Sequence, residues 1–183
     1  MNETSYSHAY GESNYHIVFS PKYRHAIFDE NDFKNHGSEL KRFCEESFVR
    51  TAGEYTIRIR AMKVMPDHNH LFVSLKPDQS VSWSVHKFKG RSARELFKEF
   101  PWLKEFKPGE KRFWGGHLWS EGYFFRSVGS TTDEAVDFYI KVSQDKELRD
   151  KYYTKVGGCQ EDPYVTFIKE QMRAPQMTLA DFC

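Results

Sequence analysis

The chain has few cysteines, and their spacing argues against cysteine-based structural sites. Only Cys44, Cys159 and Cys183 occur among 183 residues, with no Cys-x-x-Cys pair. An odd, widely spaced set predicts neither a disulfide framework nor a structural zinc site. No apolar run approaches the ~20 residues of a membrane span, and the polar start lacks the apolar stretch of a secretory signal. We therefore expect a soluble protein of a reducing cytoplasm.

A strong excess of one charge is also missing. The chain carries 27 basic and 26 acidic residues, a net charge of +1, so only local clusters can indicate a polyanionic partner. Aromatic residues make up 16% of the chain, which is high for a small core. Most of them are expected to pack inside, although aromatic rings also stack on unpaired bases. The length suits one compact domain with an appendage.

The apolar periodicity predicts the order of the secondary structure. Strands are expected over residues 15–19, 55–64 with a bulge near 62, 68–75 and, as a last strand or hairpin, within 114–128; helices are expected over 29–52, 80–100 and about 131–153. This β-α-β-β-α-β order is the split β-α-β pattern. We therefore expect an α+β, ferredoxin-like antiparallel sheet with helices on one face, followed by a C-terminal helix that carries Tyr139.

Two histidines stand one residue apart at the start of the predicted strand 68–75. His68 and His70 share one face of a strand and can converge on one metal ion, whereas Asn69 and Leu71 point toward the core. Imidazole is a common metal ligand, but histidines are also common on a polar sheet face. Both interpretations stay open on the residues alone.

Tyr139 lies on the last predicted helix, with Val136 and Ile140 nearby. A packing role is the simpler interpretation of such a residue. A phenol with a pKa of about 10 becomes a useful nucleophile only beside a metal or cationic groups.

Basic residues cluster in two places where they could contact phosphates, although a charged helix face is often merely solvated. The candidates for nucleic-acid binding are Lys22 and Arg24 after the first strand, and Lys87, Lys89, Arg91 and Arg94 on the helix 80–100.

Four segments in this order resemble the single-tyrosine HUH transposases of the insertion-sequence 200/605 type. They are Tyr-His-Ile-Val-Phe-Ser-Pro-Lys-Tyr-Arg from Tyr15, Met-Pro-Asp-His-Asn-His-Leu from Met65, Phe-Trp-Gly-Gly-His-Leu-Trp-Ser from Phe113, and the helix of Tyr139. The resemblance runs from about Tyr15 to Gln144. It implies that Tyr139 is the nucleophile and that His68 and His70 bind Mg²⁺ or Mn²⁺.

The chain departs from this family in two positions. The family places a glutamine four residues after the tyrosine as the third metal ligand, but here that residue is Ser143 and Gln144 follows. Gln144 lies about 140° round an ideal helix from Tyr139. We expect Gln144 to be the ligand, with Ser143, Asp67 or water as alternatives. A degraded metal site is the remaining alternative. Asn69 stands where the family has an apolar residue, and burying it costs stability unless it is hydrogen-bonded.

The resemblance also implies the activity and the partners. Such enzymes act as dimers, bind hairpins near the ends of a mobile element and cut and rejoin single-stranded DNA through a 5′-phosphotyrosine. Their active site is often completed by the tyrosine helix of the second subunit. We expect the protein to act in a prokaryotic cytoplasm. We expect residues 1–14 to be an extension, 15–156 the catalytic domain and 157–183 a tail of unknown role. The alternative is a non-cleaving or domesticated hairpin-binding module on the same fold.

Overall fold

The computed structural model describes residues 4–6, 9–11, 13–29, 36–107, 110–111, 113 and 116–128. The chain forms two compact units, Met1–Thr131 and Thr132–Cys183, and every described residue belongs to the first. The expected third helix lies outside the described residues, and so do Tyr139, Ser143 and Gln144. Their roles, and the expected boundaries at residues 14 and 156, stay predictions.

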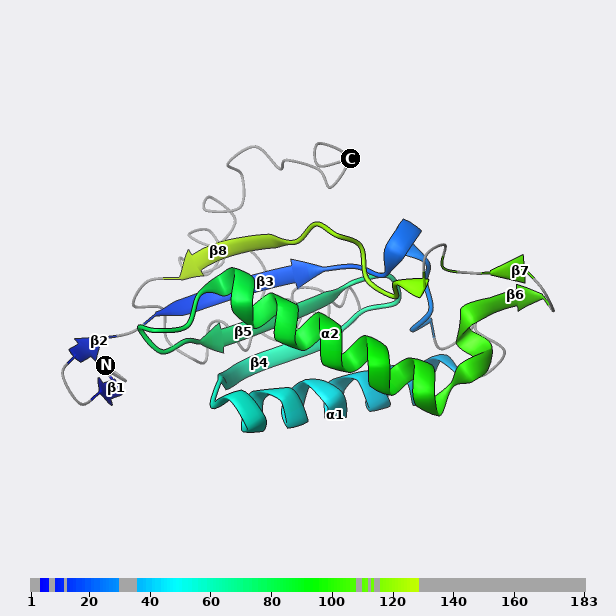
Figure 1. Cartoon of the computed structure of the whole chain (residues 1–183). Helices are drawn as coiled ribbons and strands as arrows, with labels where there is room; N and C mark the ends of the chain where they lie inside the picture. Colours follow the sequence, from blue (N-terminus) through cyan, green and yellow to red (C-terminus); the bar gives the residue numbers. More distant parts are fainter. Residues whose placement is uncertain are drawn as a thin grey trace, which may run out of the picture. The chain divides into compact units, whose positions relative to one another are not determined.

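The described residues of the first unit form two long helices, four longer strands and several short elements (Figure 1). In chain order they are β1 (Thr4–Tyr6), β2 (Ala9–Gly11), β3 (Asn14–Phe19), the 3₁₀ turn η1 (Lys22–Arg24), α1 (Gly37–Tyr55), β4 (Arg58–Val64), β5 (Asn69–Ser74), α2 (Val81–Glu99), the 3₁₀ turn η2 (Pro101–Lys104), β6 (Glu105–Lys107), β7 (Glu110–Lys111) and β8 (Phe124–Val128). In the described part of the chain, no helix is long and apolar enough to cross a membrane.

The main sheet has the strand order β4-β5-β3-β8, and each neighbouring pair is antiparallel. The two central strands of the sheet, β3 and β5, are adjacent, with Ile17 opposite Leu71. This order, with one helix between β3 and β4 and another between β5 and β8, is the split β-α-β arrangement. The expected α+β fold with a ferredoxin-like sheet is therefore confirmed.

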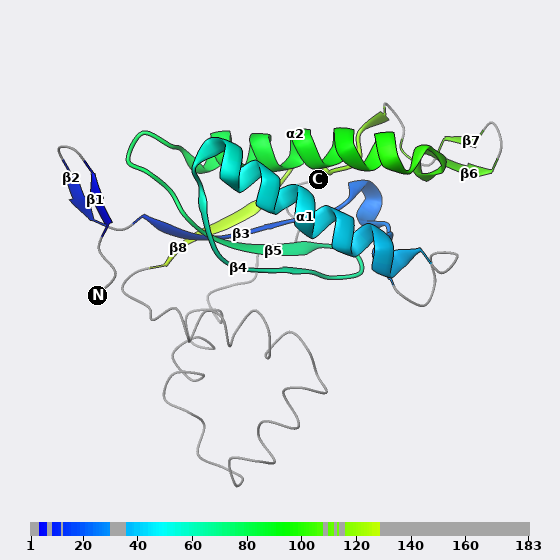
Figure 2. The same cartoon turned by 90° about the horizontal axis from the view of Figure 1, so that it is seen from below.

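Both long helices cover the same face of this sheet (Figure 2). Leu71 and Val73 of β5 point to this face and join a core formed with residues of α1 and α2 such as Phe48 and Phe88. His70, which precedes Leu71, therefore points to the opposite face, because side chains alternate along a strand. Asn69 lies on the core side and is fully buried, and its Nδ2 donates a hydrogen bond of 2.9 Å to the carbonyl of Phe19.

Several element boundaries and one register shift differ from the sequence-based expectation. The helix α1 begins at Gly37 rather than at residue 29, and β4 begins at Arg58 rather than at residue 55. The helix α1 continues through Gly53 to Tyr55 and ends at Thr56, which adopts a left-handed conformation with φ of 54° and donates its N–H to the carbonyl of Ala52. The register shift in β4 lies between Ile59 and Ala61 rather than at Met62. Within the expected 114–128 segment, the described strand β8 begins only at Phe124.

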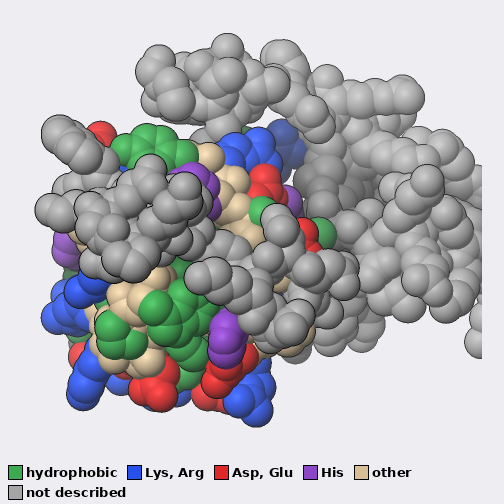
Figure 3. Space-filling model, turned by 90° about the vertical axis from the view of Figure 1, so that its right-hand side faces the viewer, with side chains coloured by type: hydrophobic (Ala, Val, Ile, Leu, Met, Phe, Trp, Pro, Cys, Tyr) green, Lys and Arg blue, Asp and Glu red, His purple; other side chains and the backbone are tan. Residues whose placement is uncertain are grey.

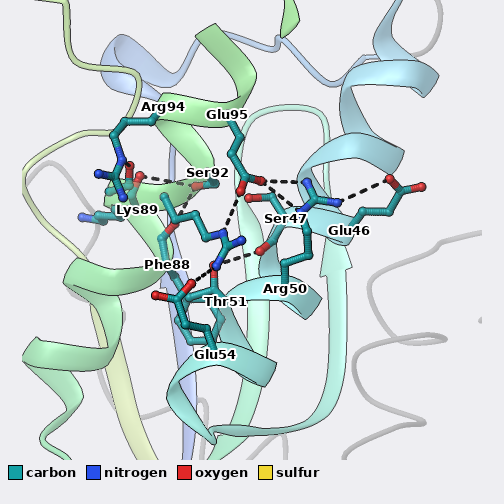
Figure 4. A network of polar contacts seen from close by, with 12 residues as sticks. Glu46, Ser47, Arg50, Thr51, Glu54, Phe88, Lys89, Ser92, Arg94 and Glu95 are labelled. Atoms are coloured by element: carbon teal, nitrogen blue, oxygen red, sulfur yellow. Dashed lines mark hydrogen bonds and ion pairs between the residues drawn. The ribbon is translucent and has the colours of Figure 1, made fainter. Parts of the chain in front are cut away.

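Ion pairs connect the outer surfaces of the two helices (Figure 4). Arg50 of α1 donates through Nη2 to a carboxylate oxygen of Glu95 of α2 at 2.7 Å, and Arg91 donates to the other oxygen of Glu95 at 2.7 Å. Arg91 also pairs with Glu54 of α1. Burial opposes the ionisation of Glu95, but the hydrogen bonds from Arg50 and Arg91 outweigh this effect and lower its pKa to about 2. This network holds α2 against α1.

Candidate functional site

The two histidines of the predicted metal site meet at the start of β5. His68 immediately precedes the strand and His70 is its second residue. Their Nε2 atoms lie 3.0 Å apart, and the rings are nearly perpendicular, with an interplanar angle of 73°. His70 is buried, whereas His68 is partly exposed. The pair therefore combines one anchored ring with one ring that is open to solvent.

Asp67 orients the ring of His68 from the outer side. The Oδ1 atom of Asp67 lies 2.6 Å from Nδ1 of His68. The other carboxylate oxygen accepts two hydrogen bonds from Arg24, at 3.1 Å from Nε and 2.7 Å from Nη2. Partial burial opposes ionisation of Asp67, but its hydrogen bond with His68 and the charge and hydrogen bond of Arg24 outweigh this effect and lower its pKa. An ionised carboxylate accepts the Nδ1 proton of His68, which leaves the Nε2 lone pair available.

A third histidine, His16, contacts His70 from the neighbouring strand β3. Its Nε2 lies 2.9 Å from Nδ1 of His70, and the two rings are stacked with an interplanar angle of 11°. Burial, followed by the charge of Arg126, lowers the pKa of His16 to about 4. Burial, followed by the neighbouring His16, His68 and Lys63, lowers the pKa of His70 to about 3. Both rings are therefore neutral near pH 7.

Sequence reasoning missed the contact of His16 with the histidine pair. The alternation over residues 15–19 does place His16 and Val18 on the face opposite Ile17, and β5 has the same alternation. What the sequence did not supply was the register, in which His16 lies opposite Phe72 and Val18 lies opposite His70. This register brings the side chain of His16 diagonally across to His70.

The opposed Nε2 atoms have the spacing that two ligands of one ion require. Two nitrogen ligands at about 2.1 Å from an ion and at right angles to each other are about 3.0 Å apart, as the two Nε2 atoms are. Each ring has a polar partner on its Nδ1 atom. The described residues contain no group of three or more His, Cys, Asp or Glu side chains arranged to hold a metal. The pair thus fits a divalent ion as two of its ligands.

The loop of η1 carries an exposed aromatic ring close to Arg24. Tyr23 has a left-handed backbone with φ of 62° and a residue exposure of 59%. Its ring lies 5.4 Å from Nζ of Lys22. The loop is fixed to the neighbouring segment because the N–H of Lys22 donates to the carbonyl of Leu118 at 2.7 Å. A left-handed tyrosine is uncommon and is maintained only where the surroundings require it.

The basic residues predicted on α2 have several different roles. Nζ of Lys89 donates to the three backbone carbonyls of residues 120–122 at 2.8–3.1 Å, and burial lowers its pKa to about 8. A phosphate contact by Lys89 would require these hydrogen bonds to break. Arg91 belongs to the ion-pair network between the helices. Arg94 is exposed, and Lys87 lies over the rings of Tyr55 and Trp83.

The surface charge around the helices is mixed. In the view of Figure 3, basic and acidic side chains are interspersed along the lower edge, where α1 runs in Figure 1. The outer face of α2 also lies on the side of the sheet opposite His70. The basic residues of α2 and the histidine pair therefore lie on opposite sides of the sheet.

Comparison with known proteins identifies the family. The sequence profile described as "Transposase IS200 like" matches residues 9–143. The ISDra2 transposase TnpA of Deinococcus radiodurans is 32% identical over 133 residues, which cover 73% of this chain and 85% of that protein. The transposase for insertion sequence element IS200 of Salmonella typhimurium is 34% identical over 140 residues, which cover 76% of this chain and 82% of that protein.

A solved structure agrees with these sequence matches. The crystal structure of a candidate transposase from Deinococcus radiodurans R1 superimposes with a TM-score of 0.53 and 28% sequence identity, covering 75% of this chain and 95% of that chain. The profile match and both relatives extend over most of the chain. The chain therefore belongs to the family of IS200-like transposases, the insertion-sequence 200/605 type that its motifs resemble.

Proposed function

We propose that this protein is a DNA transposase that binds hairpins at the ends of a mobile element and cleaves and rejoins single-stranded DNA. The observation that carries this proposal is the 3.0 Å separation of the Nε2 atoms of His68 and His70, each ring having a polar partner on its other nitrogen. Because both Nδ1 atoms already have polar partners, the two facing Nε2 lone pairs are left to bind one ion. Membership of the family supplies the reaction class.

Tyr139 is the proposed nucleophile. Its phenolic oxygen loses a proton and forms a bond to the phosphorus of one phosphodiester. The bond from that phosphorus to the 3′ oxygen breaks, and this oxygen takes up a proton to leave as a 3′ hydroxyl. The 5′ side remains as a phosphotyrosine, which stores the bond for rejoining. Attack by a 3′ hydroxyl on this linkage reverses the same steps.

His68 and His70 are the proposed ligands of Mg²⁺ or Mn²⁺, and Gln144 is the proposed third, with Ser143 as the alternative. The ion would neutralise charge that develops on the phosphate oxygens and would orient the scissile linkage. The protein's part is to hold both Nε2 lone pairs on one side. Asp67 does this for His68, because an ionised carboxylate at 2.6 Å keeps the proton on Nδ1.

The DNA contacts are proposed at two places. Lys22 and Tyr23 lie in the loop that also supplies Arg24 to Asp67, so a base stacked on the exposed Tyr23 would lie near the histidine pair. Lys87 and Arg94 on the outer face of α2 are proposed to hold phosphates of the hairpin. A homodimer, with the Tyr139 helix of one subunit serving the histidines of the other, completes the proposal.

The test is formation of a covalent adduct. Labelled single-stranded oligonucleotides that carry a hairpin are incubated with protein and Mn²⁺ and resolved on a denaturing gel. We expect an adduct with the wild-type chain and with the matched control Tyr152→Phe, and none with Tyr139→Phe or His68→Ala. Hairpin binding should survive in all variants, because the proposed phosphate contacts lie elsewhere.

The outcomes separate the two candidate functions. An adduct that persists in Tyr139→Phe would show that another residue is the nucleophile. Binding of the hairpin without any adduct would favour the non-cleaving module, in which the substitution of Ser143 for the family's glutamine has removed the metal site.

A further inference from the structure

His16 occupies the centre of β3 on the sheet face that carries His70. The residue is 7% exposed, and it therefore does not meet solvent as an ordinary surface histidine would. A buried imidazole is stable only when its nitrogens have hydrogen-bond partners. The partner of its Nε2 atom is Nδ1 of His70 at 2.9 Å.

The geometry excludes His16 as a third ligand of the same ion. His68 approaches His70 at Nε2, and His16 approaches it at Nδ1. These two nitrogens lie on different sides of one imidazole ring, and their lone-pair directions diverge widely. An ion bound by Nε2 of His70 therefore cannot also accept Nε2 of His16. His16 can therefore affect the bound ion only through His70.

The proton on His70 determines what that function is. Neutral imidazole carries one proton, so an Nε2 atom that binds a cation requires the proton to be on Nδ1. The Nδ1–H group of His70 then needs an acceptor inside the protein. Nε2 of His16 lies 2.9 Å from this Nδ1 atom, and the two ring planes are nearly parallel, at 11°.

We propose that His16 is a positioning residue that accepts a hydrogen bond from Nδ1–H of His70 and so keeps the Nε2 lone pair of His70 directed at the cation. This inference rests on the proposed metal role of His68 and His70. The arrangement matches the one at His68, where Asp67 is the partner of Nδ1. The site then has one charged and one neutral outer partner, from different parts of the chain.

The choice of acceptor suits the position. Asp67 is partly exposed and ion-paired with Arg24, so a charge is tolerated there. The position of His16 is buried, and a carboxylate in its place would lose its hydration. A neutral imidazole supplies an acceptor without that cost.

The experiment compares His16→Leu, which removes the acceptor, with His16→Gln, whose side-chain oxygen can accept the same hydrogen bond. Mn²⁺ affinity is measured by electron paramagnetic resonance on the full chain without DNA, beside wild type and His68→Ala. Thermal unfolding of each variant shows whether the fold is retained. Long-range ¹H–¹⁵N spectra with saturating Mg²⁺ report which ring nitrogen of His70 carries the proton.

We expect His16→Leu to weaken Mn²⁺ binding by about 10- to 100-fold, the range typical of outer-shell partners of metal ligands. His16→Gln should recover most of the affinity, and wild-type His70 should carry its proton on Nδ1. A His16→Leu protein that binds Mn²⁺ as wild type does, while His68→Ala does not, would overturn the role of His16. Failure of the Gln variant to recover affinity beyond the Leu variant, at equal thermal stability, would also overturn it.

A different result would identify failure of the underlying function. If wild type and His68→Ala were equally unable to bind Mn²⁺, the metal role of the pair would be wrong, and the proposal for His16 with it. A His70 proton on Nε2 in the Mg²⁺-loaded wild type would reject the role of His16 even if the pair did bind the ion.

Discussion

Arg24 donates two hydrogen bonds to one carboxylate oxygen of Asp67, a residue 43 positions further along the chain. The other oxygen of Asp67 contacts Nδ1 of His68. A residue predicted from the sequence as a phosphate contact is thus connected to the proposed metal site through one carboxylate. This connection joins the loop after β3 to the start of β5.

The connection predicts a specific effect of Arg24→Lys. Lysine keeps the positive charge but cannot reproduce the two hydrogen bonds of the guanidinium group. The arginine side chain of this ion pair is 55% exposed. Loss of the pair should therefore weaken the free energy of Mn²⁺ binding by about 1 kcal/mol or less, which lowers Mn²⁺ affinity by no more than about fivefold. Hairpin affinity should stay close to that of wild type. Calorimetric titration of Mn²⁺ and of the hairpin measures both; unchanged Mn²⁺ binding with weakened hairpin binding would instead indicate a direct phosphate contact.

The buried histidines predict how stability depends on pH. His16 has a pKa of about 4 in the folded chain and 6.5 as a free side chain, so below pH 6.5 the unfolded chain takes up a proton that the folded chain does not. The free energy of unfolding should therefore be fully retained above pH 6.5 and decline as the pH falls toward 4. The shift of His16 corresponds to a loss of about 3 kcal/mol.

Urea denaturation between pH 7 and pH 4 in the presence of EDTA measures this decline. His16→Gln lacks the titrating ring and should show a shallower decline than wild type, because carboxylates contribute equally to both proteins. Identical pH dependence in the two proteins would contradict the burial of a neutral imidazole at this position.

Lys89 predicts a loss of stability rather than of DNA binding. Substitution by methionine removes the donor to three carbonyls of residues 120–122, and we expect the free energy of unfolding to fall by about 1–3 kcal/mol. Lys98→Met, an exposed position on the same helix, is the matched control and should change it by less than about 0.5 kcal/mol. Urea denaturation measures the stability of both variants, and hairpin titration measures their DNA affinity. A Lys89→Met protein of wild-type stability that binds the hairpin weakly would support the phosphate contact.

Periodicity was sufficient to predict the sheet and the two long helices. Alternation in β5 assigned Leu71 to the core and His70 to the other face, because this assignment depends only on the period of a strand. Element ends were less predictable. Gly53 does not end α1, and the left-handed residue is Thr56 instead. The position of such a cap depends on how the helix packs, which one sequence does not contain.

The candidate site was only partly predictable for a related reason. His68 and His70 are neighbours in the sequence, so their convergence follows from strand geometry alone. The contacts of His16 with His70 and of Arg24 with Asp67 depend on strand order and register. The partners of Lys89 and Arg91 likewise depend on tertiary packing, and a basic helix face in the sequence does not distinguish a phosphate contact from an internal one.

Anomalous scattering from Mn²⁺ tests the central claim most directly. Crystals of Tyr139→Phe, which should bind DNA without cutting it, would be grown with a hairpin oligonucleotide and Mn²⁺. We predict an anomalous peak bonded to Nε2 of both His68 and His70, at about 2.2 Å from each, with a phosphate oxygen of the DNA in a further position. Bound DNA with no such peak between the two rings, at saturating Mn²⁺, would contradict the account.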